Sequence, residues 1–511
     1  MIENLITGFG VSLSLQNLLF CFIGVALGQI VGVLPGLGPT ATMALLLTLT
    51  FKLDLTTALI MLSGIYYGVQ YGGTITSVLF KIPGEASTVV TVLDGYPMAL
   101  QGRAGKALGI AAFGSFIAGT LGTVVLSFLA PPLARIALMF GYAEFASLMI
   151  LGLVLVVYLG SGSTRKAMLM GALGLAIGAI GMDPVTGYER FNFGSQTLVE
   201  GIDIAIMAMG LFGIGEILYM AENVAARSSR DVVRCPSTFK ELLPNLRDWK
   251  DSIFPILRGI VIGFPLGILP GGGGVISSFA SYATEKKLSK HPEKFGRGAI
   301  EGVAGPETAN NAAISGCFIP LLTLGIPSNC VMALLMGAFM IHGVIPGPFI
   351  IKEHPQLFWG IITSMYIGNV ILLILNIPLI RIFVKIMSVP FGVLSPLIVL
   401  ICVIGAYSLY NNPVDIIVMM IFGGLGYIMR KFDYEAAPLM LAFILGPLLE
   451  KSIRQSLIYS HGNPSIFFTR PISLLFIVAV FLLIISPLLI RMSKSQRAAL
   501  MLNRIKAANK D

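Results

Sequence analysis

Long apolar segments recur along almost the whole chain, and they leave few folds open. A helix that crosses a membrane needs about 20 mainly apolar residues. Of the 511 residues, 56% are hydrophobic and 12% are charged, whereas soluble domains carry about 25% charged residues. The sequence therefore predicts an all-α polytopic membrane protein with roughly 10–13 transmembrane helices, some of them broken or re-entrant. The candidate spans are 15–35, 55–80, 107–130, 143–160, 166–183, 203–221, 253–270, 301–325, 357–380, 393–410, 414–429, 433–449 and 472–492.

The formal net charge of +9 does not indicate nucleic-acid binding, because Lys and Arg of membrane proteins collect in cytoplasmic loops. No Lys or Arg precedes Lys52, which favours an N-terminus outside the cytoplasm. The start lacks a basic region, so no cleaved signal peptide is expected. The final segment is basic, which predicts a cytoplasmic C-terminus; its residues are Arg491, Lys494, Arg497, Arg504, Lys506 and Lys510.

Two apolar segments are interrupted by the same kind of motif. GVLPGLGPT occupies 32–40, and GILPGGGGV occupies 267–275. Proline removes a backbone donor and glycine loosens the backbone, so both motifs should unwind a helix at membrane depth. Backbone groups cannot stay unsatisfied in lipid, so such breaks must face protein or a water-filled cavity. Shorter apolar pieces at 39–51 and 328–345 are not assigned as spans.

The breaks belong to an internal repeat. Leu34-Pro35-Gly36 matches Leu269-Pro270-Gly271 at an offset of 235 residues. Further along, KIPGE at 81–85 matches GIPSN at 325–329 at an offset of 244. We therefore expect a first membrane repeat (1–222), a polar inter-repeat loop (223–251), and a second membrane repeat with additional C-terminal helices and the basic tail (252–511).

Loop charges indicate that the repeats have opposite orientations. In the first repeat, the loop after LPG holds Lys52 and Asp54, and the loop after IPG is weakly positive. In the second repeat this order reverses, because the basic residues gather after LPG, between 286 and 297. Under the positive-inside bias, corresponding loops then fall on opposite sides of the membrane. This is typical of the inverted-topology repeats of secondary transporters.

The helices that restart after the first breaks should expose N–H groups and the positive ends of their dipoles. Such ends attract anions, and two of them near a pseudo-two-fold axis could hold a carboxylate. The alternative is a kink or a close packing contact, which is our interpretation of the GxxxG spacing of Gly68 and Gly72. The candidate substrate-binding residues here are Gly36, Gly38, Thr40, Gly271, Gly272 and Gly273.

The second breaks carry more polar chemistry. FKIPGEAST at 80–88 places a cation, an anion and two hydroxyls around one Pro-Gly. Lys81 could neutralise a substrate carboxylate, and Glu85 could pair with it, carry a proton or hold a cation. Alternatively, Lys81 snorkels to the interface and Glu85 caps a helix. We assign Glu85 to ion coupling, and the candidate substrate-binding residues are Thr74, Thr76, Lys81, Gly84, Ser87, Ser328 and Asn329.

The polar segment 307–311, ETANN, precedes an apolar helix. Its oxygens suit a hard cation such as Na⁺, and its amides suit substrate oxygens. We assign Glu307 and Thr308 to ion coupling, and Asn310 and Asn311 to substrate binding. The alternative is an ordinary helix start capped by Thr308. Asp94, in DGYP, predicts a turn with a structural role. No cofactor, metal site or disulfide is expected from the five scattered cysteines and four histidines.

These motifs resemble those of the large membrane subunit, the TctA type, of tripartite tricarboxylate transporters. The matching pieces are GVLPGLGPT, YYGVQYGGTITSVLFKIPGEAST (66–88), LDGYPMALQGRAGKALG (93–109), GILPGGGG, and GPETANNAA with LGIPSN. The resemblance spans essentially the whole chain. It implies a multi-pass protein of the bacterial cytoplasmic (inner) membrane that imports tricarboxylates, dicarboxylates or related organic acids, driven by a Na⁺ or H⁺ gradient. It also implies a small membrane subunit (TctB type), an extracytoplasmic solute-binding protein (TctC type) and, by analogy, an elevator-type movement.

Other functions stay open at this point. A self-sufficient carrier or a channel would need no binding protein, although paired breaks in one chain fit a carrier better than a channel. An intramembrane enzyme is disfavoured because no GxSxG, HExxH or Walker-type motif occurs. A structural scaffold would not need costly breaks at mid-membrane. We therefore expect an ion-coupled permease subunit and not an enzyme.

Overall fold

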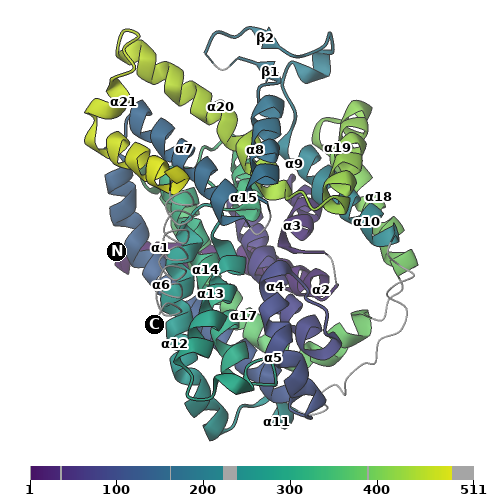
Figure 1. Ribbon diagram of the computed structural model, residues 1–511. Helices are drawn as coiled ribbons and strands as arrows, with labels where there is room; N and C mark the ends of the chain where they lie inside the picture. The colour runs from purple at the N-terminus through teal and green to yellow at the C-terminus, as the bar shows by residue number, and fades with distance from the viewer. Residues whose placement is uncertain are drawn as a thin grey trace, which may run out of the picture.

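The computed structural model describes residues 2–34, 37–160, 163–183, 185–222, 239–387 and 391–485, and these are almost entirely helical. The expected all-α membrane architecture is confirmed. In these ranges the strands are β1 (Gly181–Met182) and β2 (Glu189–Arg190), which form a small antiparallel hairpin. The hairpin lies at one end of the molecule, and α11 (Phe239–Leu242) lies at the other (Figure 1).

The helices follow the order of the expected spans. The first half contains α1 (Ile2–Ser12), α2 (Leu15–Gly32), α3 (Pro39–Leu47), α4 (Leu55–Phe80), α5 (Val89–Leu100), α6 (Ala104–Ala137), α7 (Tyr142–Leu159), α8 (Thr164–Gly178), α9 (Ile204–Ala208) and α10 (Gly215–Glu222). The second half contains α11, α12 (Leu246–Ile268), α13 (Gly273–Leu288), α14 (Glu301–Leu324), α15 (Cys330–Ile341), α16 (Ile350–Glu353), α17 (Pro355–Met387), α18 (Phe391–Tyr410), α19 (Pro413–Lys431), α20 (Ala436–Tyr459) and α21 (Ile466–Thr469). A π-helical segment, η4 (Met209–Ile214), joins α9 to α10, and short 3-10 turns lie at η1 (Thr48–Thr50), η2 (Ala86–Thr88), η3 (Gln196–Leu198) and η6 (Pro292–Lys294).

Within the described ranges, 9 helices are long and apolar enough to cross a membrane. Two further long helices, α4 with 26 residues and α14 with 24, are less apolar because they carry polar side chains. Almost every residue of these two helices is buried inside the protein. Polar groups at this depth are tolerated only where other protein groups surround them, so α4 and α14 are where a functional site is expected.

Two helix pairs carry the matched breaks, and they pack through the same register of glycines. α2 packs closely against α4, and α12 against α14. At each of six glycines, an added Cβ would collide with a backbone carbonyl of the facing helix; they are Gly24, Gly28, Gly32, Gly259, Gly263 and Gly267. Each glycine of the first half lies 235 positions before its counterpart, the offset of the LPG motifs. The shared register supports the internal repeat.

The packing interpretation of the GxxxG spacing is confirmed. A Cβ on Gly68 would lie 2.6 Å from the carbonyl oxygen of Val25, and one on Gly72 would lie 2.5 Å from that of Gln29. Both glycines therefore let α4 approach the backbone of α2.

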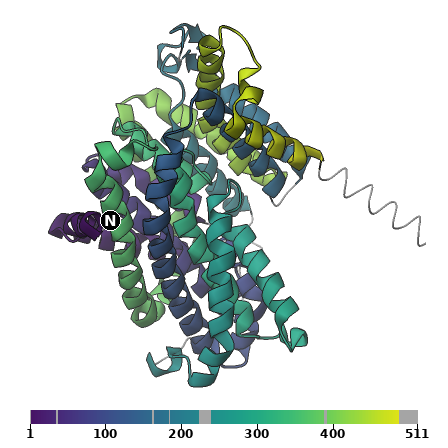
Figure 2. The same cartoon turned by 90° about the vertical axis from the view of Figure 1, so that its left-hand side faces the viewer.

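Each half has one long helix, α6 in the first and α17 in the second, and each packs against a helix of the other half's broken pair. α6 packs mainly against α14, α17 packs against α4, and the two long helices also touch each other. Figure 2 shows α6 and α17 running alongside one another through the body of the molecule. The halves are thus interleaved, with α4 and α14 at the centre.

Three sequence interpretations are wrong. Asp94 lies inside α5 and not in a turn, because its carboxylate bonds to a distant loop and not to its own backbone. Thr308 does not cap a helix start, since α14 begins at Glu301 and the Thr308 hydroxyl donates to the Ala304 carbonyl at 2.6 Å. The span expected at 253–270 begins earlier, at Leu246, because Asn245 caps α12. The basic tail and residues 223–238 lie outside the described residues.

Candidate functional site

The second breaks of the two halves have the same backbone geometry. The C-cap residue of α4 is Lys81 (φ 57, ψ 26) and that of α14 is Gly325 (φ 68, ψ 30), and both are left-handed. The chain restarts from extended N-cap residues, Glu85 (φ −146, ψ 172) and Asn329 (φ −153, ψ 177). A left-handed conformation is costly for a residue with a side chain, so the fold holds Lys81 in it. The correspondence supports the alignment of KIPGE with GIPSN.

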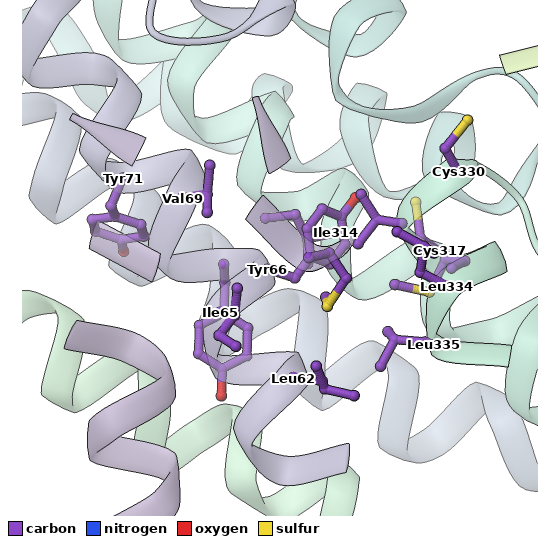
Figure 3. Close-up of a cluster of buried hydrophobic side chains, with 14 of the residues drawn as sticks. Leu62, Ile65, Tyr66, Val69, Tyr71, Ile314, Cys317, Cys330, Leu334 and Leu335 are labelled. Carbon is purple, nitrogen blue, oxygen red and sulfur yellow. The ribbon is translucent and has the colours of Figure 1, made fainter. Parts of the chain in front are cut away.

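Each of these N-cap residues reaches a helix of the other half. The Asn310 amide donates to Glu85 Oε1 at 3.0 Å, and the Asn329 amide donates to the Tyr66 hydroxyl at 3.2 Å. Tyr66 lies 244 positions before Asn310, as Glu85 does before Asn329, so the two contacts are equivalent under the repeat. Their surroundings differ, because Tyr66 lies among apolar residues near Ile314 and Cys317 (Figure 3). The polar residues are therefore concentrated around the contact of Glu85 with Asn310, and not around the equivalent contact of Asn329 with Tyr66.

The helices that follow the first breaks begin without side-chain caps. α3 follows Gly38 and α13 follows Gly272, and neither helix start has a capping side chain. At the second breaks, by contrast, Asn329 accepts the Met332 N–H at 2.9 Å. The α13 start is shaped by Gly271 (φ 78) and Gly273 (φ 49), and the Gly271 N–H donates to the Ser328 carbonyl at 2.9 Å. Because no side chain caps them, the N–H groups of the first turn of α13 could donate hydrogen bonds to an anion.

A buried polar group adjoins this helix start. We call it the Glu85 cluster: Gln70, Glu85, Ser87 and Asn310. The Ser87 hydroxyl and the Asn310 amide both donate to Glu85 Oε1. Asn310 also donates to Gln70 Oε1 at 2.9 Å. Its own Oδ1 is buried without a hydrogen-bond partner in the described part of the chain, and a Cβ added to Gly274 would overlap it.

A second buried group lies next to the first. We call it the Glu307 cluster: Thr74 of α4, Thr91 of α5 and Glu307 of α14. Thr74 donates to Glu307 Oε2 at 2.8 Å, and Thr91 donates to Oε1. Glu307 is 1% exposed. Glu307 and Asn310 lie one helical turn apart, as do Gln70 and Thr74, so α4 and α14 cross through two successive polar layers.

Neither carboxylate has a basic partner in the described part of the chain. Among the residues that the structure describes, no ion pair involves Glu85 or Glu307. An ionised carboxylate buried in a low-dielectric interior is stable only when it is compensated. Hydroxyl and amide donors supply part of this compensation, and a proton or a bound cation would supply the rest. The sequence assigned both residues to ion coupling, and the structure brings them together.

Lys81 lies outside this group. It is exposed, and its Nζ lies 5.8 Å from the centroid of the Tyr96 ring. Its contact with an aromatic ring near the end of α4 is the arrangement expected for a lysine that reaches toward an interface. The pairing of Lys81 with Glu85 is not formed.

Several other predicted residues serve local structure. Thr76 donates to the Gly73 carbonyl at 2.8 Å, and Gly84 packs against Gly73. Asn311 donates to Ser115 of α6 at 2.8 Å, on a different face from Asn310. Thr308 faces α6 and α12, where it lies against Gly114 and Gly259.

The remaining predicted residues lie at the breaks themselves. Ser328 contributes its carbonyl to Gly271, and its hydroxyl lies 3.5 Å from the Cys317 carbonyl oxygen. Gly38 and Thr40 are half-buried at the start of α3. Gly36 lies outside the described residues.

Sequence reasoning missed three polar residues. Gln70 lies within the GxxxG motif, which was interpreted only as a packing contact. Thr91 lies in a run of β-branched residues after the second break of the first half. Gln29, one turn before the first break, is fully buried, and neither atom of its amide has a partner in the described ranges. A polar side chain inside an apolar stretch was the available signal for each.

Comparison with known proteins agrees with this architecture. Residues 18–441 match the family described as the "Tripartite tricarboxylate transporter TctA family". A protein of Agrobacterium vitis described as an "Uncharacterized 52.8 kDa protein in TAR-I ttuC' 3'region" is 51% identical over 473 residues, covering 93% of both chains. A second, the "Uncharacterized protein in TAR-II ttuC' 3'region" of the same organism, is 56% identical over 211 residues, covering 41% of this chain and 87% of that protein. No solved structure was found to match. The chain belongs to the TctA family of tripartite tricarboxylate transporters.

Proposed function

We propose that this chain is the permease subunit of a secondary transporter that imports tricarboxylates, dicarboxylates or related organic acids, driven by a Na⁺ or H⁺ gradient. The observation that carries the proposal is that two buried carboxylates, Glu85 and Glu307, have no basic partner within the described residues, and that Asn310, which donates to Glu85, faces the uncapped start of α13. An anion and a coupling ion could bind side by side there, and each would favour the other electrostatically.

The anion would lie against the first turn of α13. Backbone N–H groups and the helix dipole favour negative charge at that end, and there is open space beside Gly273, where the nearest atom to an added Cβ is Asn329 Nδ2 at 4.0 Å. Such donors recognise a carboxylate group in general. The finer choice among organic acids would then be made by side chains around it, of which Ser87, which lies close to Gly274, is a candidate.

Glu85 links the two ligands. In its ionised form it would repel an anion at α13, and it accepts the only donor group of the Asn310 side chain. Once Glu85 holds a proton or a cation, a reversed Asn310 amide would present Oδ1 to that ligand and Nδ2 to the anion. The reversal would satisfy the unpartnered Oδ1 and make the two binding events mutually dependent.

We further propose that an extracytoplasmic solute-binding protein (TctC type) delivers the substrate, that a small membrane subunit (TctB type) accompanies the chain, and that both function in the bacterial inner membrane. Membership of a tripartite family supports these partners. The lysine-rich loop 286–297 would face the cytoplasm, as would the C-terminal tail. A self-sufficient carrier is the alternative.

The test is uptake of radiolabelled citrate and malate by cells that express this chain with its small subunit and binding protein. Accumulation should collapse with a sodium ionophore or a protonophore and persist when ATP alone is depleted. Uptake that follows ATP and ignores both ion gradients would refute ion coupling. Full uptake without the binding protein would favour the self-sufficient carrier.

A further inference from the structure

Asp94 is a buried carboxylate that lies outside both clusters but on the same framework. It is located on α5, one turn after Thr91, and is 0% exposed. Its Oδ2 accepts the Tyr282 hydroxyl of α13 at 2.9 Å. Its Oδ1 accepts three backbone N–H groups from the loop before α14: Gly296 at 2.9 Å, Gly298 at 2.9 Å and Ala299 at 2.8 Å.

The loop is shaped to receive this carboxylate. Gly296 (φ 83) and Gly298 (φ 103) have left-handed backbones that other residues rarely adopt, and this turns their N–H groups toward one point. The loop leads directly into α14, so the negative charge also lies near the positive end of that helix. In the described residues no ion pair involves Asp94, and its charge is met by three backbone N–H groups and the Tyr282 hydroxyl.

Asp94 therefore ties together three of the elements that build the site. α5 carries Thr91, α14 carries Glu307 and Asn310, and the α13 start is the proposed anion site. We infer that Asp94 is a positioning residue for transport: it holds α14 against α5, so that Glu307 meets Thr91. It touches neither ligand, and the inference rests on the proposed function of the site.

The competing role is a local cap that orders residues 296–299 and nothing more. The two roles differ in how far a disturbance spreads. If Asp94 only orders the loop, weakening it exposes the loop alone. If it positions α14, the disturbance reaches Glu307 two turns away and Thr91 on α5.

The variant Asp94→Asn separates these roles because it keeps the shape and removes the charge. A hydrogen bond to an ionised acceptor is roughly twice as strong as one to a neutral acceptor, so all three loop contacts weaken. The matched control is Asp248→Asn. Asp248 is also a buried carboxylate near a helix start, where it accepts the Asn245 N–H at 2.9 Å, but it touches none of the site elements.

Hydrogen–deuterium exchange of the purified chain provides a readout that does not depend on transport. In Asp94→Asn we expect faster exchange in peptides covering 295–300 and also in those covering 89–95 and 303–311. The control should change only the peptides around 245–250 and those around Arg103, whose guanidinium lies 3.6 Å from the Asp248 carboxylate. Acceleration confined to 295–300 would overturn the positioning role. Tyr282→Phe, which removes one hydroxyl, should give the same pattern at smaller size if Asp94→Asn fails to reach the membrane.

Ion and substrate titrations complete the test. In Asp94→Asn the coupling-ion concentration for half-maximal uptake should rise about tenfold, which corresponds to about 1.4 kcal/mol, while that for substrate shifts less. Asp248→Asn should leave both unchanged. Equal shifts in Asp94→Asn and the control would overturn the inference. A wild-type chain that transports no organic anion would instead refute the proposed function and leave the exchange experiment to decide on Asp94.

Discussion

Asn310 Nδ2 lies 3.0 Å from Glu85 Oε1, and this contact joins a break of the first half to a helix of the second. The same nitrogen lies 2.9 Å from Gln70 Oε1, whereas Asn310 Oδ1 faces Gly274 and has no partner within the described residues. A single amide therefore lies between a carboxylate and an uncapped helix start. From this position one side chain could contact both an ion bound at Glu85 and an anion bound at the start of α13.

Replacing Asn310 with Leu should abolish coupled uptake while the chain still folds. Leu has a similar volume but can neither donate to Glu85 nor bind an anion, so we expect uptake to fall by more than about tenfold. The measurement is initial uptake of labelled substrate, normalised to folded protein in the membrane.

The neighbouring residue gives the matched control. Asn311→Leu removes an amide from the same helix, but that amide bonds Ser115 of α6 and not Glu85. It should lower the melting temperature in detergent and leave uptake per folded molecule within about threefold of wild type. Equal losses of uptake in both variants, matched by equal losses of folded protein, would mean that Asn310 is structural.

Glu307→Gln should separate exchange from accumulation. Gln keeps one oxygen that can accept from one of the hydroxyls of Thr74 and Thr91, and its NH₂ group can donate to the other, but it is neutral and so mimics the ion-loaded state of the carboxylate. We expect counterflow exchange of substrate to persist, while uptake against a gradient is lost because the ion no longer drives the cycle. Accumulation that still follows the ion gradient would place coupling elsewhere. Glu301→Gln, in the first turn of the same helix, is the control and should retain accumulation.

Gly274→Ala tests whether the α13 start is part of the site. The added Cβ would overlap Asn310 Oδ1 and must displace it, and overpacking of this kind costs about 1–3 kcal/mol. We expect weaker substrate binding and slower uptake. The control is Gly171→Ala on α8, where no atom lies within 4 Å of the added Cβ. Its uptake should equal that of wild type. Unimpaired substrate binding by Gly274→Ala would remove α13 from the site.

The sequence predicts the helices well because long apolar runs and Pro-Gly breaks act locally. α4 begins and ends where the expected span does, at residues 55 and 80. The repeat was visible in two short motifs, and the glycine register that supports it could also have been found, since Gly24, Gly28 and Gly32 recur at one offset. Local patterns therefore suffice for the framework.

The partners of individual polar residues could not be predicted, because they depend on which helices cross. Asn310 and Asn311 are adjacent in sequence, yet they face Glu85 and Ser115 on different sides of α14. Lys81 was a natural partner for Glu85 by proximity, but a left-handed residue at the helix end turns it outward toward Tyr96. Asp94 has its acceptor role only because a loop about two hundred residues away folds beneath it.

The β1–β2 hairpin gives a prediction on pH. Backbone N–H groups of Thr186 and Val185, followed by Arg454 and Arg190, lower the pKa of Asp183 to about 2. A lowered pKa means that Asp183 stabilises the hairpin fully above its unfolded pKa of about 3.9, and that this contribution is lost only as the pH falls through about 2. The attachment of the hairpin to α20 should therefore be independent of pH between about 5 and 8.

Chymotrypsin can measure this attachment, because Tyr188 and Phe193 on the hairpin are 77% and 82% exposed. With protease activity calibrated at each pH on a small peptide, wild-type cleavage there should be equal at about pH 5 and about pH 8.

Asp183→Asn should be cut faster at both values, since it loses the charge that meets Arg454 at 2.8 Å. Glu189→Gln, whose carboxylate bonds only Asn192 within the described part of the chain, is the control and should be cut at the wild-type rate. Faster wild-type cleavage at about pH 5 would mean that Asp183 titrates well above 2 and that the backbone N–H groups do not hold its charge.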